Sequence, residues 1–135
     1  MVRFEVPGEP RAKGRPRFTK TGHTYTDSET RAYENKIIAY YRQAYGGFRF
    51  HENAFIEVNV TAYYPIPKRA TKAATEAMQS GRQLPSRKPD IDNVLKVVLD
   101  ALNGIAYKDD CRVVKITAKK AYGEPRLVIE LKGAE

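Results

Sequence analysis

Strict alternation of apolar and polar residues predicts the strands of this chain. Residues 54–64, AFIEVNVTAYY, alternate over the longest run, and successive side chains of a strand point to opposite faces. The residues on the expected core face are Ile56, Val58, Val60 and Ala62. Shorter alternating runs predict strands at residues 2–6, 112–120 and 126–132. The last two are joined by the turn sequence AYGEP, which favours a hairpin.

Apolar residues at helical spacing predict two longer helices and one short one. The first runs from a cap at Asp27 or Ser28 to about Tyr45, before a pair of glycines. Its expected apolar face consists of Tyr33, Ile37, Tyr40, Tyr41 and Ala44. The second covers residues 92–103, and the alanine-rich residues 68–80 form the short, exposed one.

The order of these elements indicates the α+β class, with a small mixed β-sheet and helices packed on it. Prolines and glycines exclude regular structure over residues 7–18, and residues 18–26 are typical of a short hairpin with its turn at Thr21-Gly22. We find no internal repeat and no low-complexity tail. We therefore expect residues 1–135 to form one domain.

Charge points toward a polyanionic partner. Lysine and arginine outnumber aspartate and glutamate by 24 to 16, for a formal net charge of +8. Two loop-like segments, residues 1–20 and 68–88, each carry six basic side chains. The candidates for contact with DNA phosphates within them are Lys13, Arg15, Arg17, Arg87 and Lys88. The alternative for each of these side chains is simple solvation.

Several classes of protein are disfavoured. No window approaches the ~20 apolar residues of a membrane span, and the N-terminal residues have no apolar core of a secretory signal. The lone Cys111 forms no internal disulfide and fits a reducing cytoplasm. The two histidines lie far apart in the sequence, so no zinc-type cluster is expected.

Carboxylates gather unexpectedly in residues 88–110, KPDIDNVLKVVLDALNGIAYKDD. Asp90 and Asp92 share one face of an extended segment, and Asp109 with Asp110 follows the predicted helix. If three of these acids converge, a hard divalent cation such as Mg²⁺ is the natural reason. Lys96, one helical turn after Asp92, is then placed to stabilise negative charge on a phosphate. The alternative is a helix cap at Asp92, ordinary loop or turn acids, and an Asp92–Lys96 surface ion pair.

This stretch resembles one family, the RusA-type Holliday-junction resolvases of bacteria and their prophages. The shared pattern is a basic residue, D-x-D-N-x-x-K, a helix carrying D-A-L, and then D-D before a strand. The early segment GEPRAKGRPRF is also similar to the family. The resemblance implies a cytoplasmic, homodimeric endonuclease that needs Mg²⁺, with Mn²⁺ as a substitute, and cuts four-way DNA junctions in recombination and repair. It assigns metal binding to Asp90, Asp92 and Asp110, and a catalytic role to Lys96.

Three other functions remain open at this point. The chain would be a non-catalytic, basic DNA-binding module if its aspartates serve only as caps and turn acids. It would be a nuclease for flaps or other branched DNA if the substrate differs from a four-way junction. An RNA-directed nuclease is the third, although the sequence lacks an aromatic RNA-binding motif of the K/R-G-F/Y type.

Overall fold

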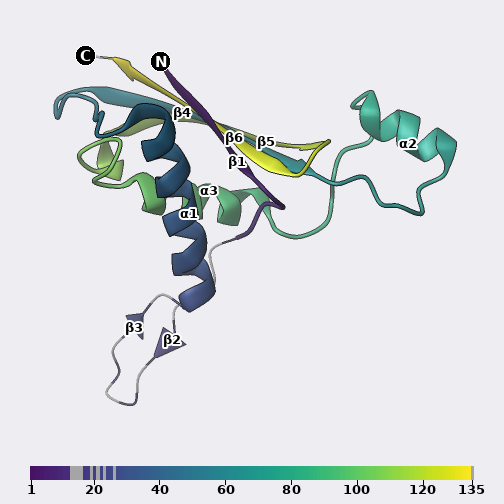
Figure 1. Ribbon diagram of the computed structural model, residues 1–135, viewed down its shortest axis with the longest axis horizontal. Coiled ribbons are helices and arrows are strands. Elements are labelled where there is room, and N and C mark those ends of the chain that lie inside the picture. Colours follow the sequence, from purple (N-terminus) through teal and green to yellow (C-terminus); the bar gives the residue numbers. More distant parts are fainter. Residues whose placement is uncertain (13–16, 19, 21, 23, 26, 135) are drawn as a thin grey trace.

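The computed structural model describes residues 1–12, 17–18, 20, 22, 24–25 and 27–134, and Figure 1 shows their arrangement. The elements in chain order are β1 (Val2–Pro7), β2 (Arg17–Phe18), β3 (Thr24–Tyr25), α1 (Ser28–Tyr45), β4 (Phe55–Tyr64), α2 (Lys72–Gln79), α3 (Ile91–Leu102), the short 3₁₀ helix η1 (Asp110–Arg112), β5 (Val113–Tyr122) and β6 (Arg126–Ala134). The predicted α+β class is confirmed, with a four-stranded mixed sheet.

The order of the strands differs from the prediction in one respect. The sheet runs β1-β6-β4-β5, so β5 and β6 are not neighbours and the predicted hairpin is wrong. β4 lies between them and pairs in parallel with β5 and antiparallel with β6. β4 takes this central place because its core face is fully apolar and buried, whereas β5 is largely exposed and suits an edge. The antiparallel pairing expected within residues 18–26 is confirmed by β2 and β3, with Arg17 opposite Tyr25, while Thr21 of the predicted turn lies outside the described residues.

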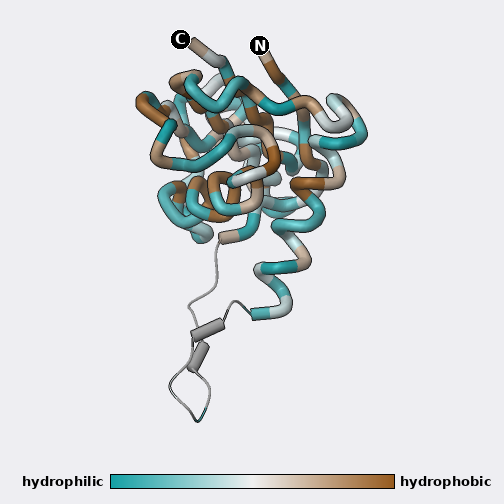
Figure 2. The backbone as a smooth tube through the Cα atoms, turned by 90° about the vertical axis from the view of Figure 1, so that its left-hand side faces the viewer, coloured by the Kyte–Doolittle hydropathy of each residue, from teal (hydrophilic) through white to brown (hydrophobic). Residues whose placement is uncertain are grey.

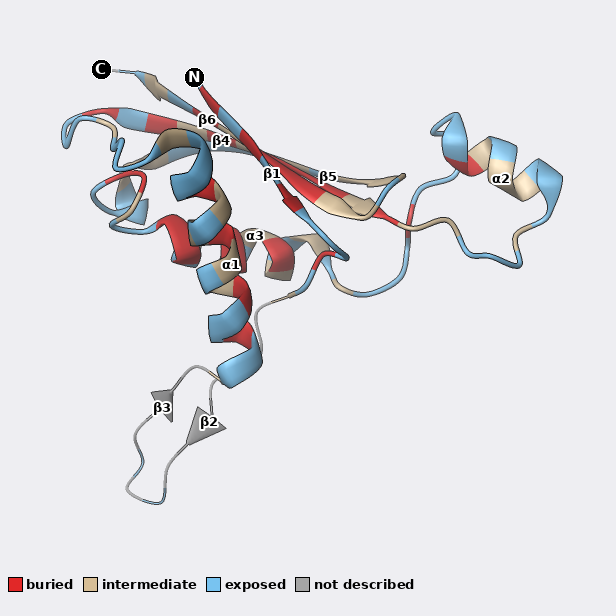
Figure 3. Ribbon diagram, in the orientation of Figure 1, coloured by how far each residue is buried: buried red, intermediate tan, exposed pale blue. Residues whose placement is uncertain are grey.

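α1 and α3 pack together and cover one face of the sheet, so that the core lies between two layers (Figures 2 and 3). The predicted core face of β4 is confirmed, because Ile56, Val58, Val60 and Ala62 are all buried. On α1, Tyr33, Ile37 and Tyr41 are buried as predicted and Tyr40 packs against the core. Ala44 is exposed instead, because the last turn of α1 presents Tyr45 to the sheet.

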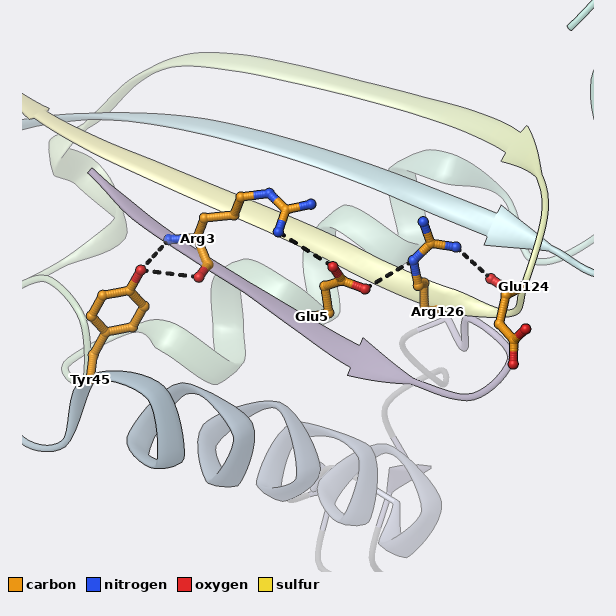
Figure 4. A network of polar contacts seen from close by, with 5 residues as sticks. All are labelled: Arg3, Glu5, Tyr45, Glu124 and Arg126. Carbon is orange, nitrogen blue, oxygen red and sulfur yellow. Dashed lines mark hydrogen bonds and ion pairs between the residues drawn. The ribbon is translucent and has the colours of Figure 1, made fainter.

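One edge of the sheet is closed by side chains of α1. The Tyr45 hydroxyl accepts a hydrogen bond from the Arg3 N–H (2.8 Å) and donates one to the Arg3 carbonyl (3.0 Å), as Figure 4 shows. Further along β1, the Lys36 ammonium donates to the Pro7 carbonyl at 2.5 Å. On the outer face, Glu5 bridges Arg3 and Arg126. Backbone groups of β1 are therefore engaged, which leaves β5 as the open edge.

The segment between β4 and α3 extends away from the two layers and carries α2, as Figure 1 shows. We call residues 65–88 the arm. α2 is shorter than the predicted 68–80 because Thr71 caps it, with the Thr71 hydroxyl accepting from the Ala74 N–H at 3.1 Å. Apart from Met78 and Pro85, the arm has few buried side chains. Among the described helices, none combines the length and apolar character that crossing a bilayer requires.

Candidate functional site

The first two predicted site residues stand at the start of α3. Asp90 has the extended backbone of an N-cap residue, but its side chain makes no cap hydrogen bond. Asp92 lies in the first helical turn, so the expected cap at Asp92 is wrong by two residues. Both carboxylates are exposed at the positive end of the helix dipole, where negative charge is favoured. Lys96 is also exposed, one turn further along. No ion pair between Asp92 and Lys96 is present in the described chain.

A buried tyrosine and a lysine hold the chain that leads into this helix. The Tyr64 hydroxyl, at the end of β4, donates to the Pro89 carbonyl at 2.5 Å. The Lys120 ammonium of β5 donates to the Arg87 carbonyl at 2.8 Å and lies 5.1 Å from the centre of the Tyr64 ring. The Arg87 guanidinium lies 5.6 Å from the same ring. Burial raises the pKa of Tyr64, while the Arg87 charge opposes this rise and the Asp90 charge adds to it.

The second pair of acids lies beyond the other end of α3. Asp109 caps η1 by accepting from the Cys111 N–H at 2.9 Å, which is the main reason that its pKa is lowered. A hydrogen bond with Asp109 is the main reason that the pKa of Asp110 is raised, and the Asp100 charge contributes further. The charges of two adjacent carboxylates repel each other, so a cation beside them is favoured. This pair therefore fits a hard divalent ion by its chemistry.

The two pairs of acids are far apart within one subunit. α3 has 12 residues, which corresponds to about 18 Å between its ends. Asp90 lies beside the end of β4, through the Tyr64–Pro89 bond, whereas η1 lies beside its start, where Arg112 donates to the Ala54 carbonyl. The described residues contain no group of three His, Cys, Asp or Glu side chains that could hold a metal ion. The expected convergence of Asp90, Asp92 and Asp110 is thus not found within one chain.

The separation follows from the direction of α3. The helix begins at the Tyr64 end of the sheet and runs back toward the start of β4, so its two flanking acidic pairs point to opposite ends of the molecule. A single subunit offers two partial ligand sets rather than one complete site. The roles of these aspartates as metal ligands therefore stay a prediction.

Comparison with known proteins gives the family. The family model described as endodeoxyribonuclease RusA matches residues 7–132, which is nearly the whole chain. The chain belongs to the RusA endodeoxyribonuclease family. The resemblance seen in the sequence is thereby confirmed, and membership implies endodeoxyribonuclease activity within a family that acts on Holliday-junction DNA. A relative from Bacillus subtilis (strain 168), the uncharacterized protein YqaN, is 33% identical over 136 residues, which cover 97% of this chain and 95% of YqaN.

The predicted DNA-binding residues of this RusA-family chain fall in two places. Lys13 and Arg15 lie outside the described residues, and for Arg17 only the backbone, in β2, is described. Arg87 and Lys88 are exposed at the end of the arm, directly before Asp90. Arg87 also forms an exposed ion pair with Glu9 at 3.5 Å, which screening by solvent makes weak.

Sequence reasoning missed Tyr64, Lys120 and the effect of Asp100 on the second pair of acids. Tyr64 ended an alternating strand and Lys120 ended another, so nothing in either pattern pointed to the 87–90 segment. Asp100 lies two helical turns after Asp92 and its charge acts on Asp110 and on the buried Tyr107. The helical spacing from Asp92 to Asp100 was the available signal. It did not reveal the approach to Asp110, because Asp110 lies beyond the end of the helix.

Proposed function

We propose that this protein is a Mg²⁺-dependent endonuclease that resolves Holliday junctions by two symmetric cuts. The observation that carries the proposal is the RusA family match over residues 7–132. The acidic pairs at the two ends of α3, on a chain of net charge +8, support it from the chemistry of the residues. Basic surroundings bind the phosphates, while the carboxylates hold the cation.

A homodimer in which each metal site draws on both subunits accounts for the separation of the acids. In a two-fold dimer the same surface is used twice, so antiparallel elements bring the start of one helix beside the end of its copy. Under this arrangement Asp90 and Asp92 of one subunit lie beside Asp110 of the other. Two such sites form in each dimer, which matches the two strands that resolution must cut.

The open edge of the sheet is the surface best suited to this contact. Val114 and Ile116 on β5 are 59% and 45% exposed, which is unusual for large apolar side chains next to an unpaired strand edge. On the covered side of the sheet, α3 contacts β5 and carries the partly buried Leu95 and Leu99. The opposite edge, β1, is engaged by Tyr45 and offers no such surface.

A two-fold axis at Ile116 would bring the acids of the two subunits together. An antiparallel pairing of two β5 strands about Ile116 places residue 110 of one subunit near residue 122 of the other. Tyr122 pairs with Tyr64, and Tyr64 holds the segment that leads to Asp90. The two-fold arrangement therefore brings the two partial ligand sets to the same end of the interface.

Each side chain then has a defined task. Asp90, Asp92 and Asp110 hold Mg²⁺, which when bound polarises the phosphodiester and activates water for attack on phosphorus. Lys96 lies one turn from Asp92 and stabilises the negative charge that develops on the phosphate oxygens. Arg87 and Lys88, which precede Asp90 directly, bind the DNA backbone next to the cut.

A cleavage assay on a synthetic four-way junction, with Mg²⁺ and with EDTA, tests the proposal. We expect paired cuts with Mg²⁺ only, and matched duplex and flap substrates should be cut far more slowly. Asp90→Asn and Asp110→Asn should each lower the cleavage rate at least 100-fold while junction binding is kept. Glu124→Gln, which removes an exposed acid on the β5–β6 connection, is the matched control and should cleave normally.

Three outcomes would contradict the proposal in different ways. Binding of the junction without cleavage in Mg²⁺ or Mn²⁺ would leave a non-catalytic DNA-binding module. Equal cleavage of flaps and four-way junctions would keep the nuclease but replace its substrate. Full cleavage by an Asp→Asn variant would remove that residue from the metal site.

A further inference from the structure

We infer that Tyr64 and Lys120 are positioning residues, which fix the backbone of residues 87–90 and thereby hold Asp90 where it binds the metal ion. The inference rests on the proposed metal-binding role of Asp90. It goes beyond that role by assigning a function to two side chains on β4 and β5, outside the acidic motif of α3.

The segment before α3 needs such support because Asp90 does not provide it. An N-cap aspartate ordinarily fixes itself by accepting a hydrogen bond from the first helical turn, as Asp27 does for α1 with the Thr30 N–H at 2.8 Å. Asp90 makes no such bond, so its carboxylate is not used by the helix. A carboxylate that makes no cap hydrogen bond is available to bind a metal ion, but the surrounding backbone must then hold it in place.

Two hydrogen bonds from the sheet supply that position. The Tyr64 hydroxyl donates to the Pro89 carbonyl at 2.5 Å, one residue before Asp90. The Lys120 ammonium donates to the Arg87 carbonyl at 2.8 Å, two residues earlier. The carbonyls of residues 87 and 89 are thus tied to two neighbouring strands, and Tyr64 itself is 1% exposed and cannot move without disturbing the core.

The same contacts separate two chemical regions. The basic arm precedes these contacts in the chain and projects from the body, and the acidic start of α3 follows them directly. Lys120 and Arg87 both lie near the face of the Tyr64 ring, and neither forms an ion pair with Asp90 in the described chain. Lys120 stands on the same face of the sheet as the helices, whereas its neighbour Lys119 points to the opposite face.

The test compares conservative variants that remove one contact each. Tyr64→Phe keeps the ring and deletes only the hydroxyl, and Lys120→Met keeps the stem and deletes the ammonium. Tyr41→Phe is the matched control for the first, because the Tyr41 hydroxyl also donates to a backbone carbonyl at 2.5 Å, that of Phe48, away from the acids. Lys119→Met is the matched control for the second, since it removes an equal charge at the next position.

Binding of Mn²⁺, followed by electron paramagnetic resonance without DNA, is the main readout, and thermal unfolding is recorded for every variant. Tyr64→Phe and Lys120→Met should weaken Mn²⁺ binding by roughly fivefold, as expected for one lost hydrogen bond. Tyr41→Phe should lower the melting temperature by as much as Tyr64→Phe but bind Mn²⁺ like the wild type. Lys120→Arg, which keeps a cationic donor, should restore most of the affinity.

The outcomes separate a failure of the positioning roles from a failure of the proposed function. If Tyr64→Phe and Tyr41→Phe bind Mn²⁺ equally well, Tyr64 has a merely structural role and the inference fails, while the proposed function stands. If Lys119→Met weakens Mn²⁺ binding as much as Lys120→Met, the effect is one of net charge and the Lys120 assignment fails. If the wild type binds no Mn²⁺ and cuts no junction with it, the proposed function fails and the inference fails with it.

Discussion

Burial of tyrosine hydroxyls gives the core a dependence on alkaline pH. Burial is the main cause that raises the pKa of Tyr33 to about 12, and it also raises that of Tyr41, Tyr64 and Tyr107. A raised folded-state pKa means that the unfolded chain loses these protons first. The contribution of these protonated hydroxyls to the unfolding free energy is therefore complete below pH ~10, the ordinary tyrosine pKa, and it is lost as the pH rises toward 12.

We predict that Tyr33→Phe removes part of this alkaline sensitivity. The wild type should lose up to about 2 kcal/mol more of its unfolding free energy than the variant between pH 9 and about 11.5, since phenylalanine has no proton to lose. Urea unfolding at a series of pH values, followed by circular dichroism, measures the difference. Parallel curves for the two proteins would show that Tyr33 ionises normally in the folded state.

At the scale of single elements, α1 depends on its cap. Asp27 accepts from the Thr30 N–H at 2.8 Å and from the Thr30 hydroxyl at 3.0 Å, and Thr30 is buried. Asp27→Ala should lower the unfolding free energy by about 1 kcal/mol. Urea denaturation at pH 7 checks this value, with Glu29→Ala, an exposed first-turn acid, as the control. A change no larger than that of the control would contradict the cap.

The arm should contribute to affinity for DNA rather than to catalysis. It carries Lys68, Arg69 and Lys72 near α2 and one acid, Glu76, and it projects from the body. Replacing the three basic residues with Gln should reduce the slope of log K against log salt by about 2 to 3, because each phosphate contact contributes close to one. Junction binding measured at several salt concentrations gives the slope. The cleavage rate at saturating protein should be unchanged, and a fall in that rate would place the arm closer to the cut.

The elements themselves were largely predictable, and their pairing was not. α1, α3 and β4 follow from local signals, namely periodicity, caps and the glycines after each helix. The hairpin of β5 and β6 was predicted from adjacency in the sequence, which says nothing of a third strand that enters between them. The aspartates of the motif were identified from their spacing, but their separation depends on the direction in which α3 crosses the sheet.

At the scale of the whole molecule, a site shared between subunits makes a prediction that a site within one chain does not. Asp90→Asn and Asp110→Asn homodimers should both be inactive. When the two variants are mixed and allowed to exchange subunits, each heterodimer should contain one site with both ligands intact and one site with neither. Nicking of one junction strand should therefore return, to about half of the wild-type rate per heterodimer.

Nicking of a labelled four-way junction by the mixture measures this recovery, and Asp90→Asn mixed with Asp92→Asn is the control. The control should stay inactive, because both changes fall on the same half of the site. Failure of the first mixture to nick, with subunit exchange verified by mass spectrometry, would exclude the shared site.

The dimer surface gives a second prediction at this scale. Ile116→Lys introduces a charge at the centre of the proposed contact and should yield monomers that are folded but do not cleave. Analytical ultracentrifugation and circular dichroism measure the two properties. Gln43→Lys, at an exposed position of α1, is the control and should remain dimeric. A fully dimeric Ile116→Lys protein would move the interface elsewhere.

The pairing of β1 with β6 has a consequence for how the protein folds. Val2 lies opposite Leu131, so the first strand waits for its neighbour until residue 131 has been synthesised. β4 similarly waits for β5, and the arm and α3 come in between. Contacts so distant in sequence slow the search for the native state to the millisecond-to-second range. The sheet should therefore assemble late, with α1 and α3 formed earlier.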